Sequence, residues 1–83
     1  MTSTIEIRPA RPTEAFAVRR LAYLDSQRPL RGDVLVATAD DIPVAAVSLT
    51  DGRIVADPFR PTADVVDLLR LRTSLHDDAA LAA

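Results

Sequence analysis

Hydrophobic and polar residues alternate over short stretches of this chain, and these stretches predict a small sheet. Residues 5–8 read apolar, charged, apolar, charged, which is the period of a strand with one buried face. Residues 34–37 are continuously apolar, which indicates a strand buried on both faces. Residues 44–49 and 54–56 are further apolar runs of strand length. The pattern therefore predicts four strands.

The connections between the last three of these strands carry turn residues. Residues 40–41 are two aspartates, and Asp51-Gly52 separates the third strand from the fourth. Asp-Gly between two strands is a pair that favours a type I′ hairpin turn. A two-residue turn at that place puts Leu49 opposite Ile54 and sets the register of the hairpin.

Residues 14–24 have the period of an amphipathic helix. Its apolar face is expected to consist of Ala17, Val18, Leu21 and Leu24. Phe16 and Tyr23 lie seven residues apart on a different face. Two interpretations are open for these rings: they pack on loops of the same subunit, or they form a contact surface for a partner.

A second helix is expected after Pro61, with Thr62 as its cap. Its apolar residues spread over roughly 220° of the helix circumference, about twice what one side of a sheet requires. They are Val65, Val66, Leu68, Leu69, Leu71 and Leu75. The apolar surface that the sheet does not cover predicts a dimer contact. The alternative is that the C-terminal tail folds back over this surface. Residues 76–83 are expected to continue the helix or to fray.

The expected order of elements is β-α-β-β-β-α, an α+β domain with a mainly antiparallel four-stranded sheet and two long helices. Residues 1–83 then form one domain, which buries only about 60% of its unfolded surface. Small domains usually gain stability from disulfides, metals or oligomerisation. The sequence has no Cys and a single His, so it offers neither a disulfide nor a zinc site of its own. The remaining sources of stability are oligomerisation and an unusually well-packed core.

Charge is distributed unevenly along the chain, although the net charge is only −2. Residues 1–32 hold six Arg against three acids, and residues 33–83 hold four Arg against nine Asp. Two interpretations are open: the two parts attract each other within the fold or between subunits, or the uneven distribution is chance surface charge, because exposed ion pairs contribute little. Nucleic-acid binding is the third choice, because the pI is about 5.1 and no recognition motif is present. It would use Arg8, Arg11, Arg19, Arg20, Arg28 and Arg31.

The first residues of the chain lack the basic start and apolar run of a signal peptide. No segment approaches eighteen consecutive apolar residues, so no transmembrane helix and no membrane contact are expected. A cytoplasmic location is the default expectation.

These elements resemble the N-terminal half of the GNAT N-acetyltransferase superfamily. Residues 5–10 are similar to the first strand of that family, and residues 11–15 to the entry of its first helix. Residues 34–46 resemble its hairpin, and Pro58 stands where the family has a proline after strand four. The resemblance covers about residues 5–72. It implies a GNAT-like half-domain, truncated relative to the family.

The resemblance also implies where a cofactor would bind. The family holds the pyrophosphate of acetyl-CoA on a glycine-rich turn, because glycine lets backbone N–H groups approach the phosphates. Residues 60–64 contain no glycine, Pro61 lacks an N–H, and Asp64 adds a negative charge. Arg60 and Thr62 would hold the cofactor if the chain bound it.

The 83 residues also do not contain the family's later strands, which carry its usual general acid. We therefore expect no catalytic residue and no metal ligand. Without a fifth strand, residues 54–56 form an open apolar edge that a dimer would cover.

The preferred interpretation is a non-catalytic domain that homodimerises or binds another protein. The expected contact residues are Phe16, Tyr23, Ile54, Val66, Leu71 and Leu75. The alternative is an acyl-CoA-dependent N-acetyltransferase completed by a dimer or a partner chain.

Overall fold

A computed structural model describes the backbone of residues 4–82 and the side chains of residues 4–74. The order of elements confirms the predicted β-α-β-β-β-α arrangement of an α+β domain. The elements are β1 (Ile5–Pro9), the short 3₁₀ helix η1 (Pro12–Glu14), α1 (Ala15–Leu24), β2 (Val34–Ala39), β3 (Ile42–Ser48), β4 (Ile54–Ala56) and α2 (Ala63–Ala82).

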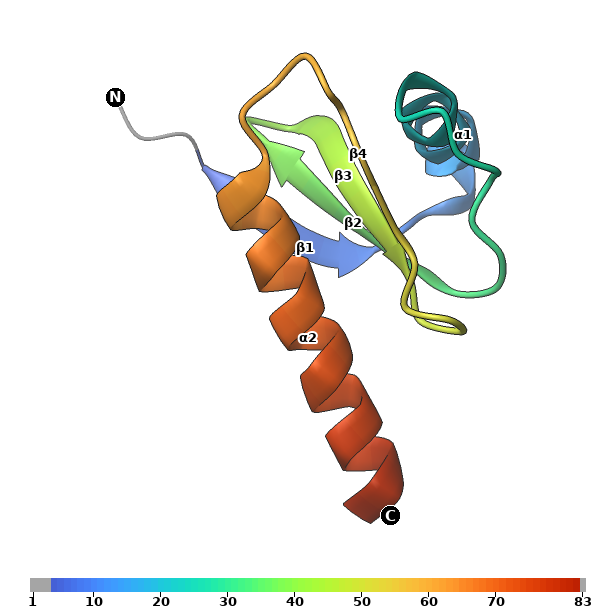
Figure 1. The fold of residues 1–83 in the computed structure, drawn as a ribbon, viewed down its shortest axis with the longest axis vertical. Coiled ribbons are helices and arrows are strands. Elements are labelled where there is room, and N and C mark those ends of the chain that lie inside the picture. Colours follow the sequence, from blue (N-terminus) through green and yellow to red (C-terminus); the bar gives the residue numbers. More distant parts are fainter. Residues whose placement is uncertain (1–3, 83) are drawn as a thin grey trace.

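The four strands form one antiparallel sheet in the order β1-β2-β3-β4. The helix α1 lies on one face of the sheet and α2 crosses the other, as Figure 1 shows. Only the first part of α2 lies over the sheet, and the rest extends past its edge (Figure 1). The inner strands β2 and β3 are covered on both faces, which explains the continuous apolar run at residues 34–37.

The two faces of the sheet carry separate clusters of buried side chains. Successive residues of a strand point to opposite faces, so Val36 packs beneath α1 while its neighbours Leu35 and Ala37 pack beneath α2. From the helices, α1 contributes Val18, Leu21 and Ala22, and α2 contributes Val65 and Leu69. Val, Leu and Ala side chains thus make up both clusters.

The tight hairpin turn lies between β2 and β3. Asp40 and Asp41 have φ angles of 51° and 70°, and Ala39 pairs with Ile42 across them. Two central residues with positive φ are the requirement of a type I′ turn. Aspartate tolerates this left-handed conformation better than most residues. The backbone N–H of Thr4 also donates to Asp40 Oδ1 at 2.9 Å, which ties the start of β1 to this turn.

The second hairpin, between β3 and β4, differs from the prediction. At Asp51-Gly52 only the glycine has a positive φ, and Ser48 N–H donates to Arg53 O at 2.9 Å. The loop therefore has four residues, and Val47 lies opposite Ile54. The predicted pairing of Leu49 with Ile54 is wrong by two residues. A shift of two preserves the face of each side chain, so the predicted face of the sheet is still correct.

A bulge in β3 positions the segment that follows β4. Ala37 pairs with Ala45 and Thr38 pairs with Pro43, so Val44 is the extra residue between them. The carbonyl of Val44 accepts the backbone N–H of Asp57 at 2.9 Å. Since bulges bend a strand and redirect its neighbours, this contact fixes where the chain leaves the sheet.

Candidate functional site

The turn between β4 and α2 is organised by the buried carboxylate of Asp57. The residue is 9% exposed, and its Oδ1 accepts the backbone N–H of Phe59 at 2.8 Å. The guanidinium of Arg60 lies beside it, with Nε 3.6 Å from Oδ2. The backbone N–H of Arg60 also closes the turn on the carbonyl of Asp57 at 3.3 Å. The turn thus surrounds an internal anion.

This arrangement determines what the turn offers to a ligand. Arg60 and Thr62, the cofactor-binding residues of the alternative interpretation, both lie in it. Thr62 directly precedes α2, and its carbonyl accepts the backbone N–H of Val66 at 2.8 Å. A diphosphate at this turn would compete with the Asp57 carboxylate for the Phe59 N–H and the Arg60 guanidinium. The negative charge of Asp57 would also repel the negatively charged diphosphate.

The outer face of α1 presents two aromatic rings to solvent. Phe16 is 77% exposed and Tyr23 is 82% exposed. The interpretation that these rings pack on loops of the same subunit is therefore wrong. Arg19 and Arg20 are exposed on the same helix, so the surface combines aromatic rings with positive charge.

Within residues 63–74, the helix α2 leaves part of its apolar surface exposed. Val65 and Leu69 are buried against the sheet and Val66 is half-buried. Leu68 is 43% exposed and Leu71 is 55% exposed. The side chain of Leu75 lies outside the described residues. The backbone of α2 continues to Ala82, so the tail does not fold back over this surface.

The outer edge of β4 is closed by side chains from the end of α1. Asp25 Oδ2 accepts the backbone N–H of Ala56 at 3.2 Å, and Gln27 Nε2 donates to the carbonyl of Ile54 at 3.2 Å. Gln27 also donates to Asp25 at 2.9 Å, which links the two contacts. The edge predicted to be open is therefore engaged. A partner strand would have to displace both side chains.

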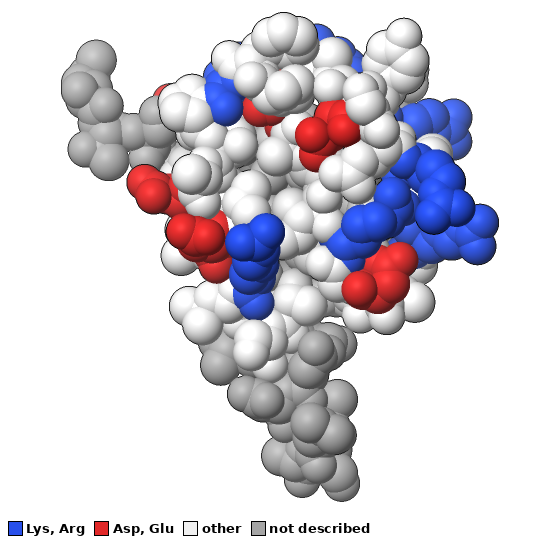
Figure 2. Space-filling model, viewed as in Figure 1, with Lys and Arg blue, Asp and Glu red and all other residues white. Residues whose placement is uncertain are grey.

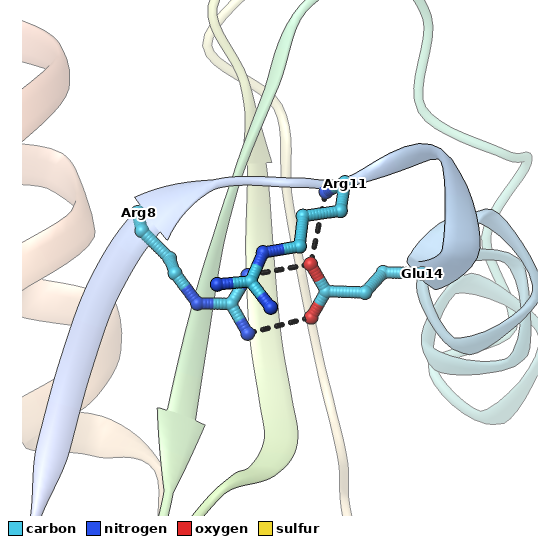
Figure 3. A network of polar contacts seen from close by, with 3 residues as sticks. All are labelled: Arg8, Arg11 and Glu14. Atoms are coloured by element: carbon cyan, nitrogen blue, oxygen red, sulfur yellow. Dashed lines mark hydrogen bonds and ion pairs between the residues drawn. The ribbon is translucent and has the colours of Figure 1, made fainter.

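An ion pair joins β1 to the start of α1 (Figure 3). Arg8 makes two bonds to the carboxylate of Glu14, and the bond from Nη2 to Oε2 is 2.8 Å long. The same carboxylate accepts the backbone N–H of Arg11 at 2.9 Å. Glu14 thereby caps the 3₁₀ helix η1. The sequence predicts Thr13 as the cap of a helix that begins at Glu14, but Thr13 lies inside η1, so that prediction is wrong.

These donors lower the pKa of Glu14 from 4.5 to about 2, with the Arg8 hydrogen bond as the main cause. A carboxylate with a lowered folded-state pKa stabilises the fold above its unfolded pKa, and this stabilisation is lost as the pH falls through the folded pKa.

We expect Glu14→Gln to lower the free energy of unfolding by about 1–2 kcal/mol at pH 6. The difference from wild type should shrink by about half at pH 3. Urea denaturation of both proteins at the two pH values measures this; an equal difference at both would contradict it.

Arginine residues gather on the side of the molecule that holds α1 and the loop after it (Figures 1 and 2). Within residues 4–74, the ion pairs are Arg8–Glu14 and Arg60–Asp57. Each joins residues of the same part of the chain, so no ion pair among these residues links the Arg-rich part to the Asp-rich part. Two hollows lie in this surface. One is bordered by Arg11 and Arg19, and the other by Arg28, Arg31 and Arg53.

Sequence reasoning did not assign a role to Asp57 or to Arg53. An aspartate followed two residues later by a backbone N–H that it can bind is an Asx turn, and this is the signal that Asp57 carried. Arg53 comes from the Asp-rich part of the chain, and only the hairpin brings it to the arginines of the loop after α1.

In the described part of the chain, no group of three or more His, Asp or Glu side chains is placed to hold a metal ion. None of the helices there combines the length and the apolar character needed to cross a membrane.

No family model, no curated protein and no solved structure matches the chain. The resemblance to the GNAT superfamily therefore stays a prediction.

Proposed function

We propose that this chain is a non-catalytic, cytoplasmic, GNAT-like domain that acts through homodimerisation, with α2 as the contact surface. The observation that carries the proposal is the apolar surface of α2 that its own subunit leaves uncovered. Leu68 and Leu71 lie one turn apart and are both substantially exposed. A second helix would meet both leucines along the same side of α2.

The length of α2 also favours a second copy as the occupant. It spans Ala63–Ala82, and its buried residues among the described side chains, Val65 and Leu69, lie in its first two turns. Most of the stability of a helix in a protein comes from packing of its apolar face. A symmetric pairing of two α2 helices would supply such packing beyond the edge of the sheet.

The other surfaces of the domain suit a two-fold contact less well. In a two-fold interface the same surface patch of both subunits comes together. Paired α1 helices would therefore bring together two surfaces that carry Arg19 and Arg20, and their like charges repel. The surface of α2 carries both signs of charge, with Asp67 and Arg70 exposed. Pairing through β4 would require the Asp25 contact to break.

The acyl-CoA interpretation has less support, because the Phe59 N–H and the Arg60 guanidinium already contact the Asp57 carboxylate. The other possibility is an interaction with a different protein through α1, and a measurement of self-association distinguishes it from homodimerisation. In that case the wild-type chain stays monomeric.

Sedimentation velocity over a wide concentration range tests the proposal. We expect the wild-type chain to shift from monomer to dimer as its concentration rises. Leu71→Glu should keep it monomeric, because a dimer would bury an unpaired charge. Phe16→Glu is the matched control: it places the same charge at an equally apolar, exposed position on the opposite face of the sheet. We expect this variant to dimerise like wild type.

Two results would contradict the proposal. One is a wild-type chain that remains monomeric at the highest concentration tested. The other is a dimer that Phe16→Glu dissociates and Leu71→Glu does not, which would place the contact on α1.

A further inference from the structure

Two loops meet at the end of the sheet opposite the 57–62 turn and form a platform. Ser48 Oγ donates to the carbonyl of Arg31 at 2.8 Å, and Leu49 N–H donates to the carbonyl of Asp33 at 2.8 Å. Gly32 packs so closely that an added Cβ would overlap Thr50 Oγ1. Its φ of 70° also suits glycine. The loop after α1 is thus held against the β3–β4 hairpin.

This platform brings together arginines that are distant in the sequence. The guanidinium of Arg53 donates from Nη2 to the carbonyl of Pro29 at 2.7 Å, which fixes it beside the loop after α1. Arg28 and Arg31 come from that loop. The three side chains border a hollow of about 410 Å³, completed by Pro29, Leu30 and Asp51.

The charge balance of the hollow is positive. It is bordered by three guanidinium groups and one carboxylate, that of Asp51. Asp51 Oδ1 already accepts the backbone N–H of Arg53 at 3.0 Å, and this bond lowers the pKa of Asp51 below its ordinary value. The carboxylate is therefore ionised at neutral pH. A net charge of about +2 remains, which an anion of about −2 would balance.

We propose that the hollow between Arg28, Arg31 and Arg53 binds a phosphate monoester. A monoester carries close to two negative charges at neutral pH, which matches the hollow, whereas each phosphodiester of a nucleic acid carries one. The planar guanidinium group binds phosphate oxygens in pairs, and arginine is the residue best suited to this. Pro29 and the half-buried Leu30 offer an apolar wall for the group that carries the phosphate.

Titrations followed by ¹H–¹⁵N NMR test this proposal. Glucose 6-phosphate and a short phosphoserine peptide are the two monoester probes, and they distinguish a small metabolite from a modified protein as the source. We expect saturable shifts of the backbone amides of residues 28, 31 and 53 with at least one of them. Succinate and an oligodeoxynucleotide without a terminal phosphate are the comparison ligands, and both should bind at least about tenfold more weakly.

Variants locate the binding site. We expect Arg28→Gln and Arg31→Gln each to weaken monoester binding about tenfold, which is the loss of one charge-assisted hydrogen bond. Arg20→Gln removes the same charge from α1 outside the hollow and should leave the affinity within about twofold of wild type. The spectrum without ligand shows whether each variant is folded.

Three results would overturn the proposal. The first is the absence of saturable shifts with both monoesters at millimolar concentration. The second is an Arg20→Gln variant that loses as much affinity as Arg31→Gln, which would indicate a diffuse charge effect. The third is tighter binding of the oligonucleotide or of succinate than of either monoester.

Discussion

Leu69→Ala is expected to lower the free energy of unfolding by about 3 kcal/mol. Leu69 is fully buried and joins α2 to the centre of the sheet, where Leu35, Val44 and Val47 belong to the same cluster. The truncation removes several buried methyl groups and leaves a cavity that a small sheet closes only in part. A domain of this size has about 4–12 kcal/mol of stability, so the loss is a large fraction of the total.

Chemical denaturation followed by circular dichroism measures the effect of Leu69→Ala. Ile42→Ala is the control, because it removes an aliphatic side chain of the same size from an exposed position on β3. We expect the control to change the free energy of unfolding by no more than about 0.5 kcal/mol. If the two variants lost equal stability, α2 would not pack on the sheet as described.

Asp57→Ala is expected to lower the free energy of unfolding by about 2 kcal/mol. The substitution leaves the backbone N–H of Phe59 without its acceptor and removes the carboxylate beside Arg60. Hydrogen bonds to a charged group contribute more than neutral ones, and this group is nearly buried. Chemical denaturation followed by circular dichroism also measures this loss.

Asp64→Ala is the control for Asp57→Ala. Asp64 is an exposed aspartate in the first turn of α2, where the helix dipole favours its negative charge. Its removal should cost about 0.5 kcal/mol. A loss at Asp57 no greater than the loss at Asp64 would show that the internal carboxylate does not organise the turn.

The order of the elements follows from local sequence patterns, whereas the hairpin geometry depends on pairing across strands. The period of apolar residues predicted every strand and both helices, because each element must bury one face or two. The Asp51-Gly52 pair was the stronger turn signal, yet the two-residue turn lies at Asp40-Asp41. The loop at Gly52 is four residues long and packs against Gly32 through Thr50, a long-range contact that no local pattern contains.

The surface features were harder to predict than the core. An apolar arc on α2 wider than the sheet requires predicted exposed leucines, and Leu71 is indeed exposed. The open edge at β4 was expected because no strand follows it, but the side chains of Asp25 and Gln27 bind it. Sequence periodicity does not indicate which polar side chain reaches a distant backbone group. The cluster of Arg53 with Arg28 likewise depends on how the two loops meet.

The central proposal is that the Asp57 carboxylate, which already contacts the Phe59 N–H and the Arg60 guanidinium, disfavours an acetyl-CoA pyrophosphate at the turn before α2. The most direct test is thermal unfolding of the wild-type chain with and without millimolar acetyl-CoA. We expect no change in the unfolding temperature. A ligand present at 100 times its dissociation constant would add about 2.7 kcal/mol of stability. A saturable stabilisation approaching that size would contradict the claim and favour the acyl-CoA interpretation.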